Sequence, residues 1–170
     1  RKRMEDLLFE EKELMRLTLQ SIGDAVVCCD AQGQVTYLNP VAQRLTGWQG
    51  FDAAGCDVDE VIRLVPSEVG ADLKSPLRAA MRDDRALPPT RGAVSHRTTH
   101  QRFDVELSAS PIADRHGHVT GAVAVLRDVT QAVAMQARMA RLAHYDVLTD
   151  LPNRVLLQDR AQQAIAQAQR

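Results

Sequence analysis

The chain has 170 residues, which is enough for one domain of ordinary size with appendages. A net charge of −1 and an aromatic content of 4% argue against a broad nucleic-acid-binding surface or a platform for stacking bases. No apolar run is long enough to cross a bilayer, and an odd number of cysteines argues against a disulfide framework and fits a reducing cytoplasm.

The first twenty residues are charged and aliphatic without Pro or Gly, so they are predicted to form one linker helix able to pair with a copy of itself. The chain starts at Arg1 rather than Met, which indicates a piece of a longer protein. A basic triplet at residues 1–3 would suit a position just inside a membrane, where Lys and Arg collect. An ordinary solvated helix start is the alternative.

Two strands and a helix follow. Residues 25–29 and 35–38 are predicted strands, and the turn between them ends at Gly33, where a positive φ is needed. Asn39 followed by Pro40 predicts a helix start, because Asn is a good N-cap and Pro suits the first helical position. That helix is expected to stop near Gly47.

The middle of the chain, residues 49–89, is predicted to be helical and irregular. It includes a short helix over residues 57–64 and a second one that begins after Ser75. Three more strands are expected over residues 93–98, 102–111 and 119–127. The order of elements predicts an α+β fold, with a five-stranded antiparallel sheet, helices on one face and linker helices at both ends.

The last predicted linker helix covers residues 131–144, after a domain over residues 21–130. Its apolar residues fall at alternating steps of three and four, which is typical of a two-heptad dimer seam. The seam consists of Ala132, Met135, Met139 and Leu142. The chain is therefore expected to form a homodimer.

Five stretches in this order resemble the PAS family of sensor domains: residues 24–27, 39–48, 75–77, 108–112 and 127–130. The resemblance implies a fold of the α+β kind described above and a sensory, non-catalytic role. It also implies that Asp128 and Thr130 hold the exit of the last helix to the domain, with Thr130 as a turn residue or N-cap.

Residues 146–154 (Asp-Val-Leu-Thr-Asp-Leu-Pro-Asn-Arg) resemble the opening signature of GGDEF domains, which make cyclic di-GMP from two GTP. Read physically, this stretch is a turn followed by a helix start. The Gly-Gly-(Asp/Glu)-Glu-Phe hairpin and the metal-binding Asp are missing, so residues 145–170 are expected to be the truncated start of such a domain and this fragment to be no enzyme. The parent is expected to be a diguanylate cyclase, with or without a phosphodiesterase domain further on.

The cofactor of such a domain must be argued from this sequence. Cys56 lacks the neighbours of a reactive flavin-binding cysteine, and residues 52–92 contain no His that would serve as a haem ligand. Among the histidines, His96 and His100 share a metal only if a turn folds them together. Adjacent Cys28 and Cys29 would point to opposite faces of a strand, which leaves a redox role open. No metal site is expected, and a small apolar ligand or none is favoured over haem or flavin.

An apolar pocket is predicted between sheet and helices, with Trp48 as one wall and core packing as the alternative role of that ring. The strand alternation gives its lining as Val27, Trp48, Leu77, Met81, Leu107, Val123 and Val125.

The sequence thus predicts a cytoplasmic sensory fragment that relays a signal through a dimeric helix to a covalently attached GGDEF domain. Anchoring of its parent at the inner membrane is left open. Two alternatives stand beside it: a constitutive ligand-free dimerisation module, and a sensor for a cyclic di-GMP phosphodiesterase. No nucleic-acid partner is expected.

Overall fold

The computed structural model describes residues 13–14, 17–18, 22–65, 75–146, 148–149 and 151–168. The predicted helix over residues 1–20 lies almost wholly outside these ranges, and its described residues 13, 14, 17 and 18 are helical. Two compact units are present, Arg1–Val129 and Thr130–Arg170, and each is described by itself. No described helix is both long and apolar enough to span a membrane.

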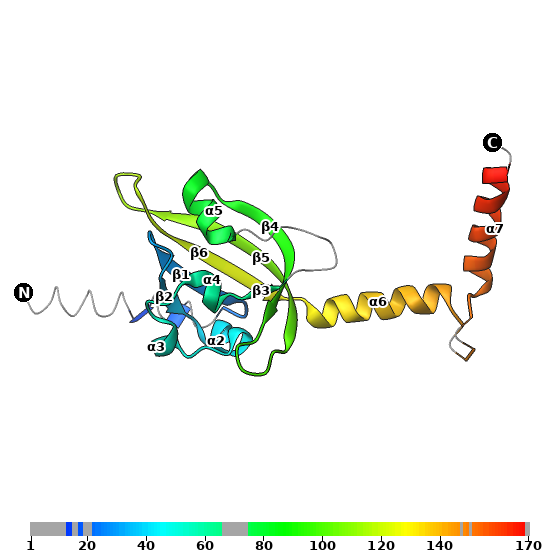
Figure 1. Cartoon of the computed structure of the whole chain (residues 1–170), viewed down its shortest axis with the longest axis horizontal. Coiled ribbons are helices and arrows are strands. Elements are labelled where there is room, and N and C mark those ends of the chain that lie inside the picture. Colours follow the sequence, from blue (N-terminus) through cyan, green and yellow to red (C-terminus); the bar gives the residue numbers. More distant parts are fainter. Residues whose placement is uncertain are drawn as a thin grey trace, which may run out of the picture. The chain divides into compact units, whose positions relative to one another are not determined.

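The first unit is built on one antiparallel sheet in the order β2-β1-β6-β5-β4-β3 (Figure 1). Its strands are β1 (Ala25–Asp30), β2 (Val35–Leu38), β3 (Leu64–Val65), β4 (Leu87–Ser95), β5 (Arg102–Ala113) and β6 (Val119–Asp128). Its helices are α2 (Pro40–Thr46), α3 (Gly50–Ala53), α4 (Val58–Val61) and α5 (Pro76–Asp83). The predicted α+β class is confirmed.

The predicted count of five strands was wrong, because the described sheet contains six. The helix predicted over residues 57–64 ends at Val61, and Leu64 and Val65 then pair with Val94 and Ala93 as β3. β4 also begins earlier than predicted, at Leu87, and passes through Pro88 and Pro89. Prolines are tolerated there because the ladder to β5 shifts register between Leu87 and Thr90, so no regular hydrogen bond is lost.

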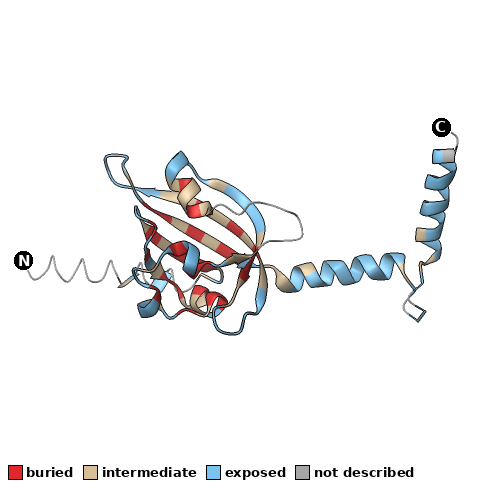
Figure 2. Ribbon diagram, viewed as in Figure 1, coloured by how far each residue is buried: buried red, intermediate tan, exposed pale blue. Residues whose placement is uncertain are grey.

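The core lies between one face of the sheet and the helices, as the alternation of buried residues along the strands shows (Figure 2). Alternate residues of β1, β5 and β6 point into it, including Val27, Leu107 and Leu126. Helices α2, α4 and α5 cover it with Leu45, Val61, Leu77 and other small or aliphatic side chains. Burial of this apolar surface is the main force that holds the helices to the sheet.

Buried Asn39 joins the start of α2 to β1. Its Oδ1 accepts hydrogen bonds from the amides of Ala42 (2.8 Å) and Val26 (2.9 Å), and its Nδ2 donates to the carbonyl of Asp24 (2.9 Å). The predicted N-cap is thus confirmed, and the same side chain fixes the helix against the first strand. The predicted positive φ at Gly33 (83°) is also confirmed, and Gly117, in the turn between β5 and β6, has a φ of 82°.

The second unit consists of α6 (Thr130–His144), α7 (Arg154–Ala168) and a tight turn between them. Asn153 closes the turn, because its Nδ2 donates to the carbonyl of Ala143 (2.6 Å) and its Oδ1 accepts from the amide of Leu156 (3.1 Å). Asp146 accepts from the amides of Leu148 and Thr149, both at 3.0 Å. The described residues of the GGDEF-like stretch therefore form a turn and a helix start, as predicted.

Candidate functional site

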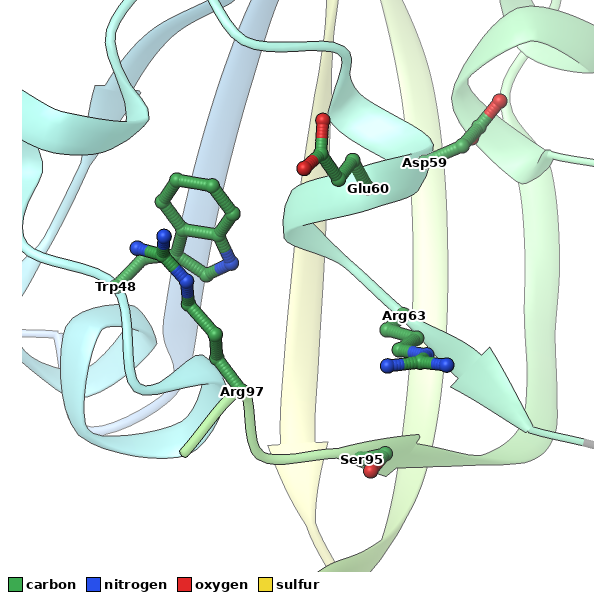
Figure 3. A pocket seen from close by; sticks show the side chains of 6 residues that line it. All are labelled: Trp48, Asp59, Glu60, Arg63, Ser95 and Arg97. Atoms are coloured by element: carbon green, nitrogen blue, oxygen red, sulfur yellow. The ribbon is translucent and has the colours of Figure 1, made fainter. Parts of the chain in front are cut away.

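A pocket of about 340 Å³ lies where α4, the end of β4 and the β4–β5 hairpin meet (Figure 3). Its volume falls in the range of small-molecule sites. Trp48 forms one wall and α4 contributes the acidic side of the rim. The lining residues are Trp48, Asp59, Glu60, Arg63, Ser95 and Arg97.

Backbone hydrogen bonds fix the segments that carry this pocket. The amide of Arg97 donates to the carbonyl of Thr46 (2.8 Å), which ties the hairpin to the end of α2. The amide of Ser95 donates to the carbonyl of Arg63 (3.0 Å), which ties β4 to the chain after α4. The bases of both arginine side chains are therefore held in place by the chain itself.

Arg97 and Trp48 form a cation–π pair, with the guanidinium carbon 3.7 Å from the ring centroid. Figure 3 shows the guanidinium lying over the ring. Trp48 is only 6% exposed and belongs to the core, so the ring is a rigid support for Arg97. The prediction left Trp48 as either a core residue or a wall of an apolar pocket; the structure places it in the core, and the pocket that it borders here is a different, polar one.

The two acidic rim residues differ in their partners. Asp59 accepts a hydrogen bond from Arg78 Nε (3.0 Å), and Figure 3 shows its side chain pointing away from the other lining residues. Arg78 also pairs with Asp57, and the hydrogen bond that Arg78 donates to Asp59 is the main cause of the raised pKa of Arg78. Within the described part of the chain, the side chains of Glu60, Arg63 and Arg97 form no ion pair.

The predicted apolar lining does not come together as a whole. Val27, Leu77 and Leu107 lie in the core, with Met81 packed against it. Val123 and Val125 pair with Cys28 and Val26 and lie on the opposite face of the sheet, so their assignment to one pocket with Val27 was wrong. The inward residues of β6 are Ala122, Ala124 and Leu126.

The polar pocket residues Glu60, Arg63, Ser95 and Arg97 were missed from the sequence. They come from separate segments, and nothing in their spacing distinguishes them from other exposed charges.

The pocket lies at the end of the sheet where the chain leaves it. Ser95 ends β4, Arg102 starts β5 and Asp128 ends β6, opposite Val105. Val129 links β6 to α6 and is called the exit below. Its amide donates to the carbonyl of Asp104 (2.9 Å), so the exit is bonded to β5 just after the hairpin. α6 begins at Thr130, which makes Thr130 the first helical residue rather than the cap before it.

An ion pair on the outer side of this exit joins the first and last strands. Arg127 Nη2 lies 3.3 Å from Asp24 Oδ2, and this hydrogen-bonded carboxylate raises the pKa of Arg127. Both residues belong to the stretches that carry the PAS resemblance, which shows that these stretches meet in space.

The histidines and cysteines have local explanations. His96 Nδ1 accepts from the amides of Thr98 (3.3 Å) and Thr99 (3.2 Å), and His100 takes a positive φ of 55° in the same hairpin. Burial, aided by neighbouring Cys29, raises the pKa of the Cys28 thiol to about 11. Among the residues that the structure describes, no group of three His, Cys, Asp or Glu side chains is placed to hold a metal ion.

The profile of the PAS fold family matches residues 19–134, which include the pocket, the whole sheet and the exit strand. The chain belongs to the PAS fold family. A solved PAS domain of a protein from Colwellia psychrerythraea superimposes with a TM-score of 0.57 at 20% identity, covering 70% of this chain and 97% of that one.

Two relatives of this PAS chain are cyclic di-GMP proteins by name. The probable diguanylate cyclase DgcE of Escherichia coli (strain K12) is 33% identical over 153 residues, which are 90% of this chain and 14% of DgcE. The cyclic di-GMP phosphodiesterase PdeB of Shewanella oneidensis is 27% identical over 161 residues, 95% of this chain and 18% of PdeB. The chain thus spans less than a fifth of either relative.

Proposed function

We propose that this PAS chain is the input and relay portion of a cyclic di-GMP signalling protein and that it controls a GGDEF output domain through a dimeric helix. The observation that carries the proposal is the order of elements at the end of the chain. The last strand, β6, is followed by α6 with its apolar seam and then by the GGDEF-like stretch at residues 146–154. The similarity to DgcE, which is 33% identical over 90% of this chain, supports the same assignment.

The surface of α6 supports a dimer. Met135 and Met139 are each 59% exposed and Leu142 is 51% exposed, and Ala132 is exposed beside them. A 15-residue helix is marginal in water when none of its residues is buried. Pairing of the seam with a second copy would bury these side chains and stabilise the helix.

The exit offers a mechanical route from the domain to α6. The hairpin at residues 96–101 borders the pocket, and β5 starts directly after it and bonds to Val129 through Asp104. A shift of the hairpin would therefore reach the exit through one strand. Paired helices change between discrete packings, and such a change would alter how two output domains face each other.

The test uses the full-length protein and the rate of cyclic di-GMP formation from GTP with and without stimulus. Asp128→Ala is expected to leave the domain folded and to abolish the difference between the two rates, while exposed Asp52→Ala on α3 is the matched control. Regulation in Asp128→Ala as large as in the unaltered protein would overturn the relay. A constitutive dimerisation module would need the seam but not Asp128.

A phosphodiesterase output is the second candidate, because PdeB is 27% identical over 95% of the chain. The same full-length protein incubated with cyclic di-GMP distinguishes the two outputs. Hydrolysis without synthesis would replace the cyclase in the proposal and leave the relay geometry unchanged.

A further inference from the structure

The pocket beside Trp48 is lined by charged side chains that do not all have an ion-pair partner among the described residues. Arg63 and Arg97 carry guanidinium groups with no ion pair in the described part of the chain, and they lie on different sides of the pocket, Arg97 over Trp48 and Arg63 before β3 (Figure 3). A guanidinium is a strong hydrogen-bond donor to a carboxylate, and the hollow of about 340 Å³ has room for a small acid. We propose that this pocket binds a small monocarboxylate, with Arg63 and Arg97 as the cationic groups of its lining.

Charge argues for one negative charge on the ligand rather than two. Arg63 and Arg97 contribute two positive charges, and Glu60 contributes one negative charge on the rim. Asp59 is engaged by Arg78 at 3.0 Å and points away. The side chains that face the pocket therefore carry a net positive charge of one, and Glu60 would repel a dianion more than a monoanion.

The Arg97 side chain is held on the Trp48 ring before a ligand binds. Arg97 is therefore suited to be a binding group, and Trp48 is its positioning residue. The guanidinium stacks on the ring at 3.7 Å, which leaves the N–H groups at its edge free to donate. The buried ring also fixes the side chain before a ligand arrives, so less entropy is lost on binding. The apolar parts of Trp48 and of the arginine stems would contact the body of the acid.

This pocket differs from the apolar pocket that the sequence predicted. It shares only Trp48 with that set, and its other lining residues are polar and lie at the end of the sheet. A monocarboxylate bound here would be the input of the proposed function. Its role as a signal rests on that function, whereas its binding does not. Binding is measured on this chain and output on the full-length protein, so either can fail alone.

The chain contains one tryptophan, so the fluorescence of Trp48 reports on this pocket directly. The titration uses sodium butyrate at constant ionic strength balanced with chloride. 1-Butanol is an uncharged ligand with the same alkyl chain, and inorganic phosphate, with the titration run at about pH 8, is mainly the dianion. The expected result is a saturable change with butyrate in the millimolar range, none with butanol, and weaker binding of phosphate.

Three variants complete the test. Arg63→Gln is expected to weaken butyrate binding about tenfold, because one charged hydrogen bond is lost. Glu60→Gln is expected to tighten it roughly two- to fivefold, because a like charge is removed. Arg91→Gln, an exposed arginine of β4 outside the pocket, is the control and should change nothing.

Thermal melts establish that each variant is folded. The proposal is overturned if butyrate gives no saturable signal up to tens of millimolar, if Arg63→Gln binds as well as Arg91→Gln, or if Glu60→Gln weakens binding. Tighter binding of phosphate than of butyrate would overturn the monocarboxylate class.

Discussion

Replacing Gly47 with alanine probes the contact that holds the β4–β5 hairpin against α2. Gly47 has a φ of 78°, and a Cβ added there would clash with the imidazole ring of His96. The left-handed backbone costs an L-residue about 1–2 kcal/mol. Overpacking against the imidazole adds about 1–3 kcal/mol, because the ring must move out of its place.

The expected total is a loss of roughly 2–5 kcal/mol, a large part of the stability of an ordinary domain. Gly117→Ala is a matched control, since Gly117 has nearly the same φ of 82° but no atom within 4 Å of the added Cβ. The control should show the backbone cost alone. The difference between the two variants then measures the steric part.

A double-mutant cycle with His96→Ala isolates the same quantity in a second way. The single change His96→Ala removes the acceptor of the Thr98 and Thr99 amides, which water can replace, at a cost of about 1 kcal/mol. Combined with Gly47→Ala it should relieve the overpacking, which gives a coupling of about 1–3 kcal/mol. Urea unfolding followed by Trp48 fluorescence and by circular dichroism measures all four proteins. Additivity within about 0.5 kcal/mol would refute the packing of His96 on Gly47.

Three further outcomes are expected. Asn39→Ala should lower the free energy of unfolding by about 2–4 kcal/mol, because it removes the helix cap and leaves buried partners unsatisfied; a loss under about 1 kcal/mol in urea titration would contradict this. The Cys28 thiol, with its pKa raised to about 11, should react slowly with iodoacetamide at neutral pH. Its contribution to stability is fully present below the unfolded thiol pKa of about 8.5 and is lost as pH rises toward 11, so Cys28→Ala should flatten the alkaline decline of the melting temperature, and an unchanged decline would speak against it. Met139→Glu should convert a dimer to monomers in sedimentation velocity, whereas Ala140→Glu, one residue off the seam, should not; equal effects would rule out the seam.

Local chemistry made much of this fold predictable. Asn39 before Pro40 favours a helix start, and Gly33 and Gly117 favour turns that no other residue enters as easily. Residues 103–107 of β5 alternate between apolar and charged residues, so their inward face was evident. These features depend on neighbours in sequence, and the structure agrees with them.

Other features depended on neighbours in space. β6 is apolar on both faces, so alternation alone could not tell whether its valines or its alanines face the helices. The structure places Ala122, Ala124 and Leu126 on the side of the helices. β3 has two residues and forms only because β4 lies beside it. The pocket draws Arg63 and Arg97 from segments that only the folded sheet brings together.

The prolines of β4 have a consequence for the isolated domain. On its outer side β4 pairs with β3 only at Ala93 and Val94, so the stretch with Pro88 and Pro89 has no partner strand on that edge among the residues that the structure describes. Proline offers no amide hydrogen to an incoming chain. A strand from another molecule would therefore find no regular ladder to extend there, and this edge is protected against aggregation.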